Sequence, residues 1–138
     1  MKTHEIHGHT SEVAFTAYGK TLAGAFEHAG VAMFDIMAET TDQEPDNTTT
    51  ISCEATDHEA LLYDFLDELI YRRDTEYMIY TSFDVTIEET GTGYRLEAIA
   101  SGIPMDQIQT TLDVKAVTYS GMTIEHDNHW QVTVTLDV

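Results

Sequence analysis

The first long stretch with the periodicity of an α-helix covers residues 20–39. Its apolar residues recur at spacings of three and four, which places them on one helix face. They are Leu22, Phe26, Ala29, Met33 and Met37. Thr21 stands at the expected N-cap position. Gly24 and Gly30 either weaken this helix or allow it to pack closely on a sheet.

A second helical pattern covers residues 56–74. Asp57 is a candidate N-cap, and Arg72 and Arg73 suit the negative end of the helix dipole. Glu68 and Arg72, four residues apart, form a favourable charge pair. The apolar positions are Leu61, Leu62, Phe65, Leu66, Leu69 and Ile70. The pattern predicts an amphipathic helix that buries this face.

Most other segments alternate between apolar and polar residues with the period of two that is typical of β-strands. They cover residues 13–18, 48–54, 77–88, 94–101, 112–119 and 130–137. The sequence GTG at 91–93 predicts a hairpin turn. In the last segment Val132, Val134 and Leu136 face one way, and Asp137 lies on the opposite, polar face.

Strands and helices do not alternate regularly along the chain. We therefore expect an α+β fold in which a largely antiparallel or mixed sheet packs against two helices. The polar segment 38–50, which contains Pro45, is typical of a loop, and neither side of it alone has enough apolar residues for a core. We expect residues 1–138 to form a single domain.

Composition argues against several classes of function. The chain has 25 Asp and Glu against 6 Lys and Arg, which gives a formal net charge of −19. A nucleic-acid surface needs a basic patch and an anionic membrane would repel this chain, so we expect neither partner. The single cysteine, Cys53, excludes an internal disulfide, and we expect it to be a buried structural residue. Without a secretory signal pattern or a bilayer-long apolar run, we expect a cytoplasmic protein.

Several histidines have spacings that resemble those of zinc ligands. They are His4, His7 and His9 near the start, and His126 and His129 near the end. Structural zinc sites use four ligands, mostly Cys and His, at fixed spacings. Because the spacings are loose and the cysteine is remote, we expect solvated histidines.

Three acidic residues, Asp64, Asp67 and Glu68, share one face of the second predicted helix. Carboxylates in such groups can bind divalent cations or transfer protons. The polar face of an amphipathic helix is the simpler interpretation, and we adopt it.

The last two residues offer oxygen ligands of the kind that suits Ca²⁺ or Mg²⁺. Asp137 has its side-chain carboxylate, and Val138 carries the α-carboxylate. They would matter if the fold placed another carboxylate, such as that of Glu12, beside them. The spacing of residues along the chain cannot show this.

Three stretches together resemble the archease family. The first, HTSEVAFTAYGKTLAGAFEHAGVAMFDIM, is similar to the family's H-T-A-D-V-G-F-x-A-Y-G-x-T-L-x-E-A-F-E-N-A-A-x-A-M-F-x-x-M. The second, LLYDFLDELIYRRDTE, is similar to L-L-x-D-W-L-x-E-L-L-x-x-x-D-T-E. The third is VKAVTYSGMTI, followed by a strand that ends VTLDV where the family ends V-x-D-I or similar. Their order and spacing match over essentially the whole chain.

The resemblance implies a small α+β protein that assists the RtcB-type tRNA-splicing RNA ligase. That ligase joins RNA ends using Mn²⁺ and GTP, and the archease promotes guanylation of its active-site histidine and multiple turnover. The resemblance thus implies a protein cofactor in tRNA splicing or RNA repair that is not itself an enzyme. GTP would be used by the partner ligase. A chaperone-like role has also been attached to the family.

The resemblance also assigns residues. The aspartate of H-T-A-D falls on Glu12, the penultimate aspartate on Asp137 and the last residue on Val138. This implies a divalent-metal site at an acidic tip, with Ca²⁺ preferred to Mn²⁺ or Mg²⁺. The family lysine falls on Lys115, a candidate contact to the partner or its nucleotide. Glu12 keeps the charge of the aspartate on a longer arm, and Gly8 stands where an acidic or other polar residue is common.

Two other classes of function remain open. The chain could be a stand-alone acidic Ca²⁺-binding, chaperone-like module with another client, which co-purification with or without a ligase would distinguish. It could also be a small metal hydrolase using the histidines and Glu12, whose activity would disappear in His9→Ala. The sequence shows no nucleophile–base pair and no complete ligand set, so the hydrolase is disfavoured.

The acidity has two explanations. It could attract a basic partner by electrostatic steering. It could instead adapt the whole surface to high salt, where charges are screened within about 3 Å at 1 M. Because the acidic residues are spread along the chain and lysine is scarce, we favour adaptation to salt.

If the surface is adapted to high salt, the fold should loosen at low ionic strength. The screening length grows to about 30 Å at 0.01 M salt, so repulsion between the acidic residues returns. Far-UV circular dichroism at decreasing NaCl should therefore show a loss of secondary structure. A spectrum that is unchanged between molar and millimolar salt would contradict the explanation.

Overall fold

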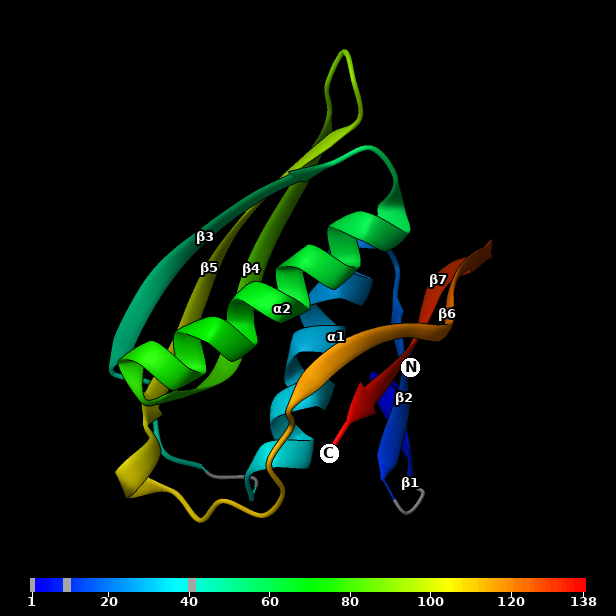
Figure 1. Ribbon diagram of the computed structural model, residues 1–138. Helices are drawn as coiled ribbons and strands as arrows, with labels where there is room; N and C mark the ends of the chain where they lie inside the picture. Colours follow the sequence, from blue (N-terminus) through cyan, green and yellow to red (C-terminus); the bar gives the residue numbers. More distant parts are fainter. Residues whose placement is uncertain (1, 9–10, 40–41) are drawn as a thin grey trace.

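Two antiparallel sheets and two α-helices make up the protein in this computed structural model, which describes residues 2–8, 11–39 and 42–138 (Figure 1). The strands are β1 (His4–Gly8), β2 (Glu12–Gly19), β3 (Asn47–Ala55), β4 (Met78–Glu89), β5 (Tyr94–Pro104), β6 (Ala116–Asp127) and β7 (His129–Asp137). The helices are α1 (Leu22–Met37), α2 (His58–Glu76) and the short 3-10 helix η1 (Met105–Gln107).

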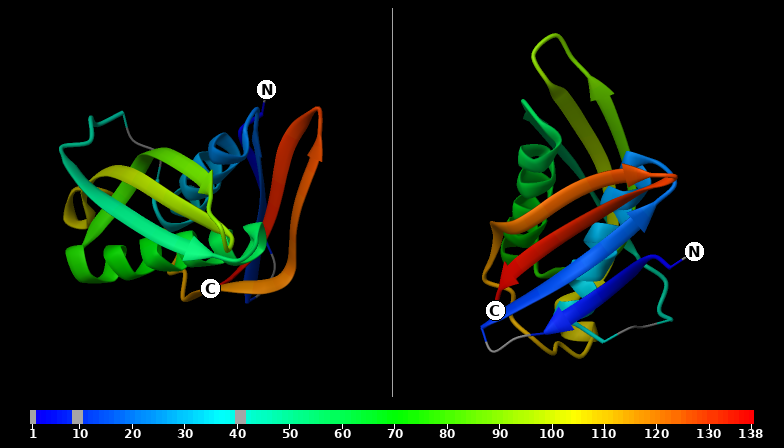
Figure 2. Two further views of the ribbon diagram at one scale, coloured as in Figure 1. Left: turned by 90° about the horizontal axis from the view of Figure 1, so that it is seen from above. Right: turned by 90° about the vertical axis from the view of Figure 1, so that its right-hand side faces the viewer.

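The helices lie between the two sheets. One sheet has the strand order β1-β2-β7-β6 and the other β3-β5-β4. Helix α1 contacts β2 of the first sheet and β4 of the second, and α2 contacts β6 and β3, as both views of Figure 2 show. The α+β expectation is confirmed, but the strands form two sheets where one was expected. Strand alternation predicts which face is buried, not which strands pair.

Both helices begin where the sequence predicts. The Thr21 hydroxyl accepts a hydrogen bond from the Gly24 N–H at 2.9 Å, and the Asp57 carboxylate accepts one from the Ala60 N–H at 2.8 Å. The predicted apolar positions are buried, except that Leu22 is partly exposed. The predicted pair of Glu68 and Arg72 is present, with 3.0 Å between its oxygen and nitrogen. Within the described residues, no helix is long and apolar enough to cross a membrane.

The strand predictions hold for five segments and fail at two places. Residues 112–115 lie outside any strand, and the strand predicted there begins at Ala116 and runs to Asp127. Strand β1 was not predicted, because its sequence HEIHG has a single large apolar residue. The predicted loop 38–50 is also too long, since β3 already begins at Asn47.

Gly30 allows α1 to pack closely on β4. A Cβ atom added at Gly30 would lie 2.7 Å from the Phe83 ring, closer than real contacts allow. The Phe83 ring packs with those of Phe34 and Phe65, at centroid distances of 6.2 and 6.1 Å. Of the two explanations for this glycine, close packing on a sheet is therefore the one that the structure supports.

Cys53 is half-buried on β3. Burial, together with the charges of Asp64 and Glu68 on α2, raises the pKa of Cys53 to about 11. The thiol is therefore protonated at neutral pH and is a poor nucleophile. This agrees with a structural role.

Replacing Gly30 with alanine should destabilise the protein. The gain in helix propensity is about 1 kcal/mol, whereas overpacking a filled interior typically costs about 1–3 kcal/mol. Thermal unfolding should show a lower Tm for Gly30→Ala. In a Phe83→Leu background the same change should be neutral or stabilising, because the ring is gone. A higher Tm for Gly30→Ala alone would show that α1 can move away from β4.

Cys53 should react slowly with a thiol reagent in the folded protein. An ordinary thiol has a pKa of about 8.5, so a pKa of about 11 lowers the thiolate population at pH 8 more than about 100-fold. The rate with Ellman's reagent should be about tenfold or more below that in guanidinium chloride, because the greater nucleophilicity of a thiolate of higher pKa offsets part of the loss. Equal rates in the two conditions would refute the raised pKa.

Candidate functional site

The pairing of β2 with β7 brings the two ends of the chain together. In its register Glu12 is the direct partner of Asp137, and Val13 is the partner of Leu136. The Val138 N–H donates a hydrogen bond to the Ser11 carbonyl at 3.2 Å. The residues that the family resemblance singles out at opposite ends of the sequence are therefore neighbours.

Glu12, Asp137 and Val138 form what we call the acidic tip. Val13 and Leu136 point into the core, with 6% and 0% exposure, so the neighbouring Glu12 and Asp137 point outward. Both carboxylates are exposed. Like charges directly opposite each other on paired strands repel and destabilise the pair. A cation between them would relieve this repulsion.

The donor set of the acidic tip fits part of a site for a hard cation. Two carboxylates and the main-chain carbonyl oxygen of Val138 are oxygen ligands, and Ca²⁺ takes six to eight of these. No group of three or more His, Cys, Asp or Glu that could hold a metal occurs among the described residues. The tip would therefore leave coordination positions for water or for groups of a partner. That these residues hold a metal stays a prediction.

A backbone hydrogen bond holds Lys115 beside the acidic tip. Its N–H donates to the Asp137 carbonyl at 2.8 Å, and the next residue, Ala116, pairs with Asp137 across the sheet. The Lys115 side chain is exposed. It has no ion pair within the part of the chain that the structure describes, so its charge is available to a partner.

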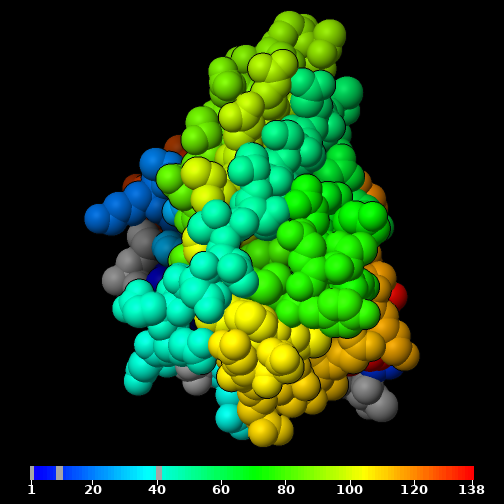
Figure 3. All heavy atoms as spheres, turned by 90° about the vertical axis from the view of Figure 1, so that its left-hand side faces the viewer, coloured from blue at the N-terminus to red at the C-terminus, as the bar shows by residue number. Residues whose placement is uncertain are grey.

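Residues 109–115, which we call the connecting segment, join the tip to the C-terminal ends of both helices. The Thr111 N–H donates to the Met37 carbonyl of α1 at 2.8 Å, and the Val114 carbonyl accepts from Arg73 of α2 at 3.1 Å. Figure 1 shows the segment, yellow to orange, passing the ends of both helices. In Figure 3 the preceding yellow segment lies against the green surface of α2.

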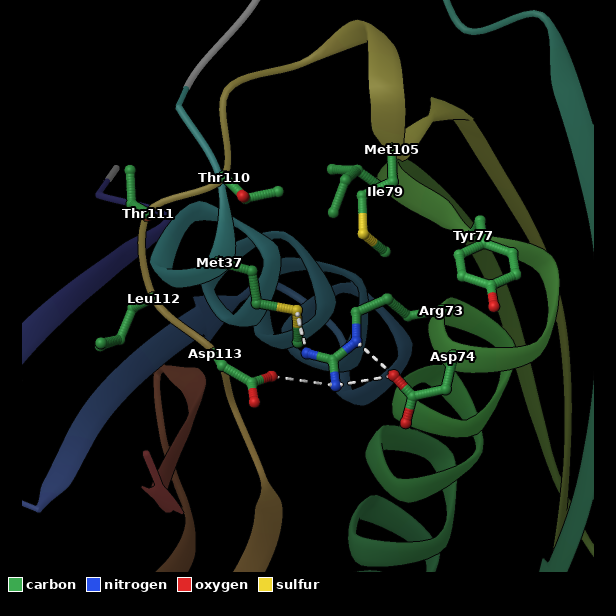
Figure 4. Close-up of a pocket in the computed structure, with 10 residues that line it drawn as sticks. All are labelled: Met37, Arg73, Asp74, Tyr77, Ile79, Met105, Thr110, Thr111, Leu112 and Asp113. Carbon is green, nitrogen blue, oxygen red and sulfur yellow. Dashed lines mark hydrogen bonds and ion pairs between the residues drawn. The ribbon is translucent and has the colours of Figure 1, made fainter.

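Arg73 holds the connecting segment through a buried guanidinium group (Figure 4). Besides the Val114 carbonyl, it contacts the carboxylates of Asp74 at 2.9 Å and Asp113 at 3.4 Å. It also donates to the Met37 sulfur at 3.2 Å. The sequence pattern assigns Arg73 only to the helix dipole. Its spacing from Leu69 continues the apolar face, which was the signal that could have revealed its burial.

A pocket of about 280 Å³ opens beside Arg73. Its lining is largely apolar and comes from both helices, β4, η1 and the connecting segment. The lining residues are Met37, Arg73, Asp74, Tyr77, Ile79, Met105, Thr110, Thr111, Leu112 and Asp113. Figure 4 shows the Met37 sulfur beside the guanidinium group, and the side chains of Met105 and Ile79 farther from it, on the side toward η1. Sequence reasoning did not find this pocket, because its walls come from separate parts of the chain.

Tyr77, at the rim of the pocket, has a strained backbone. It ends α2 in the left-handed conformation, with φ 54° and ψ 46°. This position usually holds glycine, and an L-residue there costs about 1–2 kcal/mol. The side chain is 70% exposed, so burial recovers little of that cost.

The described histidines form no metal site. His4 contacts Asp35 at 2.9 Å, and burial raises the pKa of that carboxyl group. His126 stacks on Trp130, with ring centroids 4.3 Å apart. His9, which both the zinc pattern and the hydrolase alternative would use, lies outside the described residues.

The chain matches known proteins over its whole length. Residues 4–138 match the model of the Archease protein family (MTH1598/TM1083). Relatives named Protein archease include those of Thermococcus gammatolerans, 37% identical, and Pyrococcus abyssi, 35% identical. Each alignment covers all of both chains. None of these names states a catalytic activity.

Solved structures agree with this assignment. The solution structure of Methanobacterium thermoautotrophicum protein 1598 is 34% identical, with a TM-score of 0.89 and full coverage of both chains. The crystal structure of an archease from Thermotoga maritima, described as a possible chaperone, has a TM-score of 0.63 at 16% identity over 94% of this chain and 93% of that one. This second likeness concerns the fold alone. From its family match and its full-length relatives, the chain belongs to the archease family.

Proposed function

We propose that this archease activates an RtcB-type RNA ligase. It would promote guanylation of the ligase and multiple turnover in tRNA splicing or RNA repair, as a cytoplasmic protein cofactor that is not itself an enzyme. The ligase, not this chain, would use GTP. With a net charge of −19, the chain would contact the basic surface of the ligase rather than RNA directly.

The pairing of Glu12 with Asp137 carries the proposal. Two exposed carboxylates held opposite each other favour a cation, and Val138 is held beside this pair by the hydrogen bond from its N–H to the Ser11 carbonyl. We propose that the acidic tip binds a divalent metal, with Ca²⁺ preferred and Mn²⁺ or Mg²⁺ as alternatives. The ligase would complete the coordination or receive the metal when the tip enters its active site.

Lys115 would take part in the same contact between the acidic tip and the ligase. The backbone N–H of Lys115 bonds to the Asp137 carbonyl, and its side chain is exposed. The ammonium group has no ion pair within the described residues. An ammonium group there could contact a phosphate of the nucleotide bound to the ligase.

The alternative is a Ca²⁺-binding, chaperone-like module with another client. The description of the Thermotoga maritima archease as a possible chaperone favours this alternative. The two proposals differ in their partner. The first requires stable binding to the cognate ligase and faster guanylation. The second requires neither.

Removing a carboxylate of the acidic tip should reduce activation. With the cognate ligase, GTP and Mn²⁺, we expect Glu12→Ala and Asp137→Ala to lower the stimulation of ligase guanylation by about tenfold or more, a loss of about 1.4 kcal/mol or more. Glu12→Asp, which introduces the usual family residue, should retain activation. Glu125→Ala is the matched control, because Glu125 is an exposed acid at the far end of the same sheet.

Metal binding is measured separately by calorimetric titration with CaCl₂. The same alanine variants should weaken binding, while Glu125→Ala should not. Wild-type stimulation by Glu12→Ala or Asp137→Ala would remove these residues from the activation mechanism.

A further inference from the structure

The pocket beside Arg73 has the chemistry of a docking site. Its walls include the side chains of Met37, Met105 and Ile79, and about 280 Å³ of space lies between them. Methionine side chains are flexible and polarizable, and they line surfaces that adapt to apolar partners. Leu112, 42% exposed, and Tyr77 extend this apolar surface to the rim.

The rim of the pocket is negative. The carboxylates of Asp74 and Asp113 both contact the Arg73 guanidinium group, which carries one positive charge against their two. Their side chains are 59% and 75% exposed, so they remain open to a partner. An adjoining hollow that shares Tyr77 and Met105 adds Glu76 and Asp106. Anions are therefore repelled, and cationic groups are attracted.

The pocket also lies next to the acidic tip. The connecting segment places Asp113 at the pocket and, two residues later, Lys115 against Asp137. The buried Arg73 holds the carbonyl of Val114 between them. A partner large enough to cover the tip would therefore reach the pocket.

We propose that the pocket receives an aliphatic side chain of a basic protein segment, with lysine or arginine on either side of it. The aliphatic group would enter between Met37 and Met105, and the flanking cations would contact Asp74 and Asp113. The Tyr77 ring would cover the inserted side chain. That this segment belongs to the ligase rests on the proposed function, whereas the chemistry of the segment follows from the pocket alone.

A second copy of the same chain fits this surface poorly. Two chains would each bring a charge of −19 to the contact. Four of the six Lys and Arg residues already form ion pairs within the chain: Lys2, Arg72, Arg73 and Arg95. The occupant is therefore expected on another, basic protein.

The six methionines of the chain offer a direct test. Protein labelled with ¹³C at the methionine methyl groups is titrated with the peptide acetyl-Gly-Lys-Leu-Arg-Gly-amide, and methyl NMR signals are recorded. The signals of Met37 and Met105 should shift and saturate, whereas that of Met122 on β6 should not. Peptides with serine in place of leucine, or glutamate in place of both cations, should bind about tenfold or more weakly. Equal shifts with the serine peptide, or no shift at Met37 and Met105, would overturn the proposal.

Tyr77→Gly separates a docking role from a structural one. Glycine relieves the left-handed strain, so the Tm should rise or stay the same while peptide binding weakens about fivefold. Leu112→Ser should weaken peptide binding similarly. Ile99→Ser is the matched control, since Ile99 is 49% exposed on β5, outside the pocket. If both Tyr77→Gly and Leu112→Ser bind the peptide as tightly as the wild type, these rim residues do not contact the bound segment.

Binding to the cognate ligase distinguishes this inference from the proposed function. If the wild-type chain binds and activates the ligase, Tyr77→Gly and Leu112→Ser should each raise the Kd about fivefold or more. Unchanged ligase binding by both variants would overturn docking of the ligase here and leave the proposed function intact. If the wild-type chain does not bind the ligase, the proposed function fails, and the peptide titration alone decides whether the pocket docks a basic segment.

Discussion

The pairing of β2 with β7 holds the two ends of the chain together and organises the four-stranded sheet. It joins residues near the two ends of the sequence in the middle of the four-stranded sheet, and both helices pack between that sheet and the second one. Its register turns Val13, Phe15, Val134 and Leu136 inward, where all are buried. A shift of one residue would expose these side chains and bury carboxylates in their place. The core therefore fixes the register, and the register fixes Glu12 opposite Asp137.

The buried guanidinium group of Arg73 stabilises the end of the molecule that carries the acidic tip. Arg73 ties the connecting segment to α2, and the segment in turn is bonded to α1 and to β7. A buried guanidinium group is tolerated because Asp74, Asp113 and a carbonyl satisfy it. This arrangement has a functional consequence, since one short segment sets both the position of Lys115 beside the acidic tip and one wall of the apolar pocket. The same segment therefore positions residues of both the tip and the pocket.

Electrostatics and packing act differently on that surface. The surface of the chain is acidic throughout, which favours basic partners but gives them no preferred place to bind. In the proposed docking, specific placement would come from features that the acidity does not supply: two carboxylates held opposite each other, a pocket with methionine walls, and a strained tyrosine on its rim. A partner that meets these features together would be oriented with respect to the tip. That orientation is what delivery of a metal or activation of nucleotide transfer requires.

Local signals in the sequence identified the two long helices, five of the strands and the family. Helical spacing identified the buried faces of α1 and α2, and Thr21 and Asp57 marked their starts, because these signals act within a few residues. The stretches that resemble the archease motifs also pointed to Glu12, Asp137 and Lys115. The folded chain alone shows that the strands form two sheets, that Glu12 lies opposite Asp137, and that Arg73 is buried in a pocket wall. These facts depend on contacts between residues far apart in the chain, which periodicity does not record.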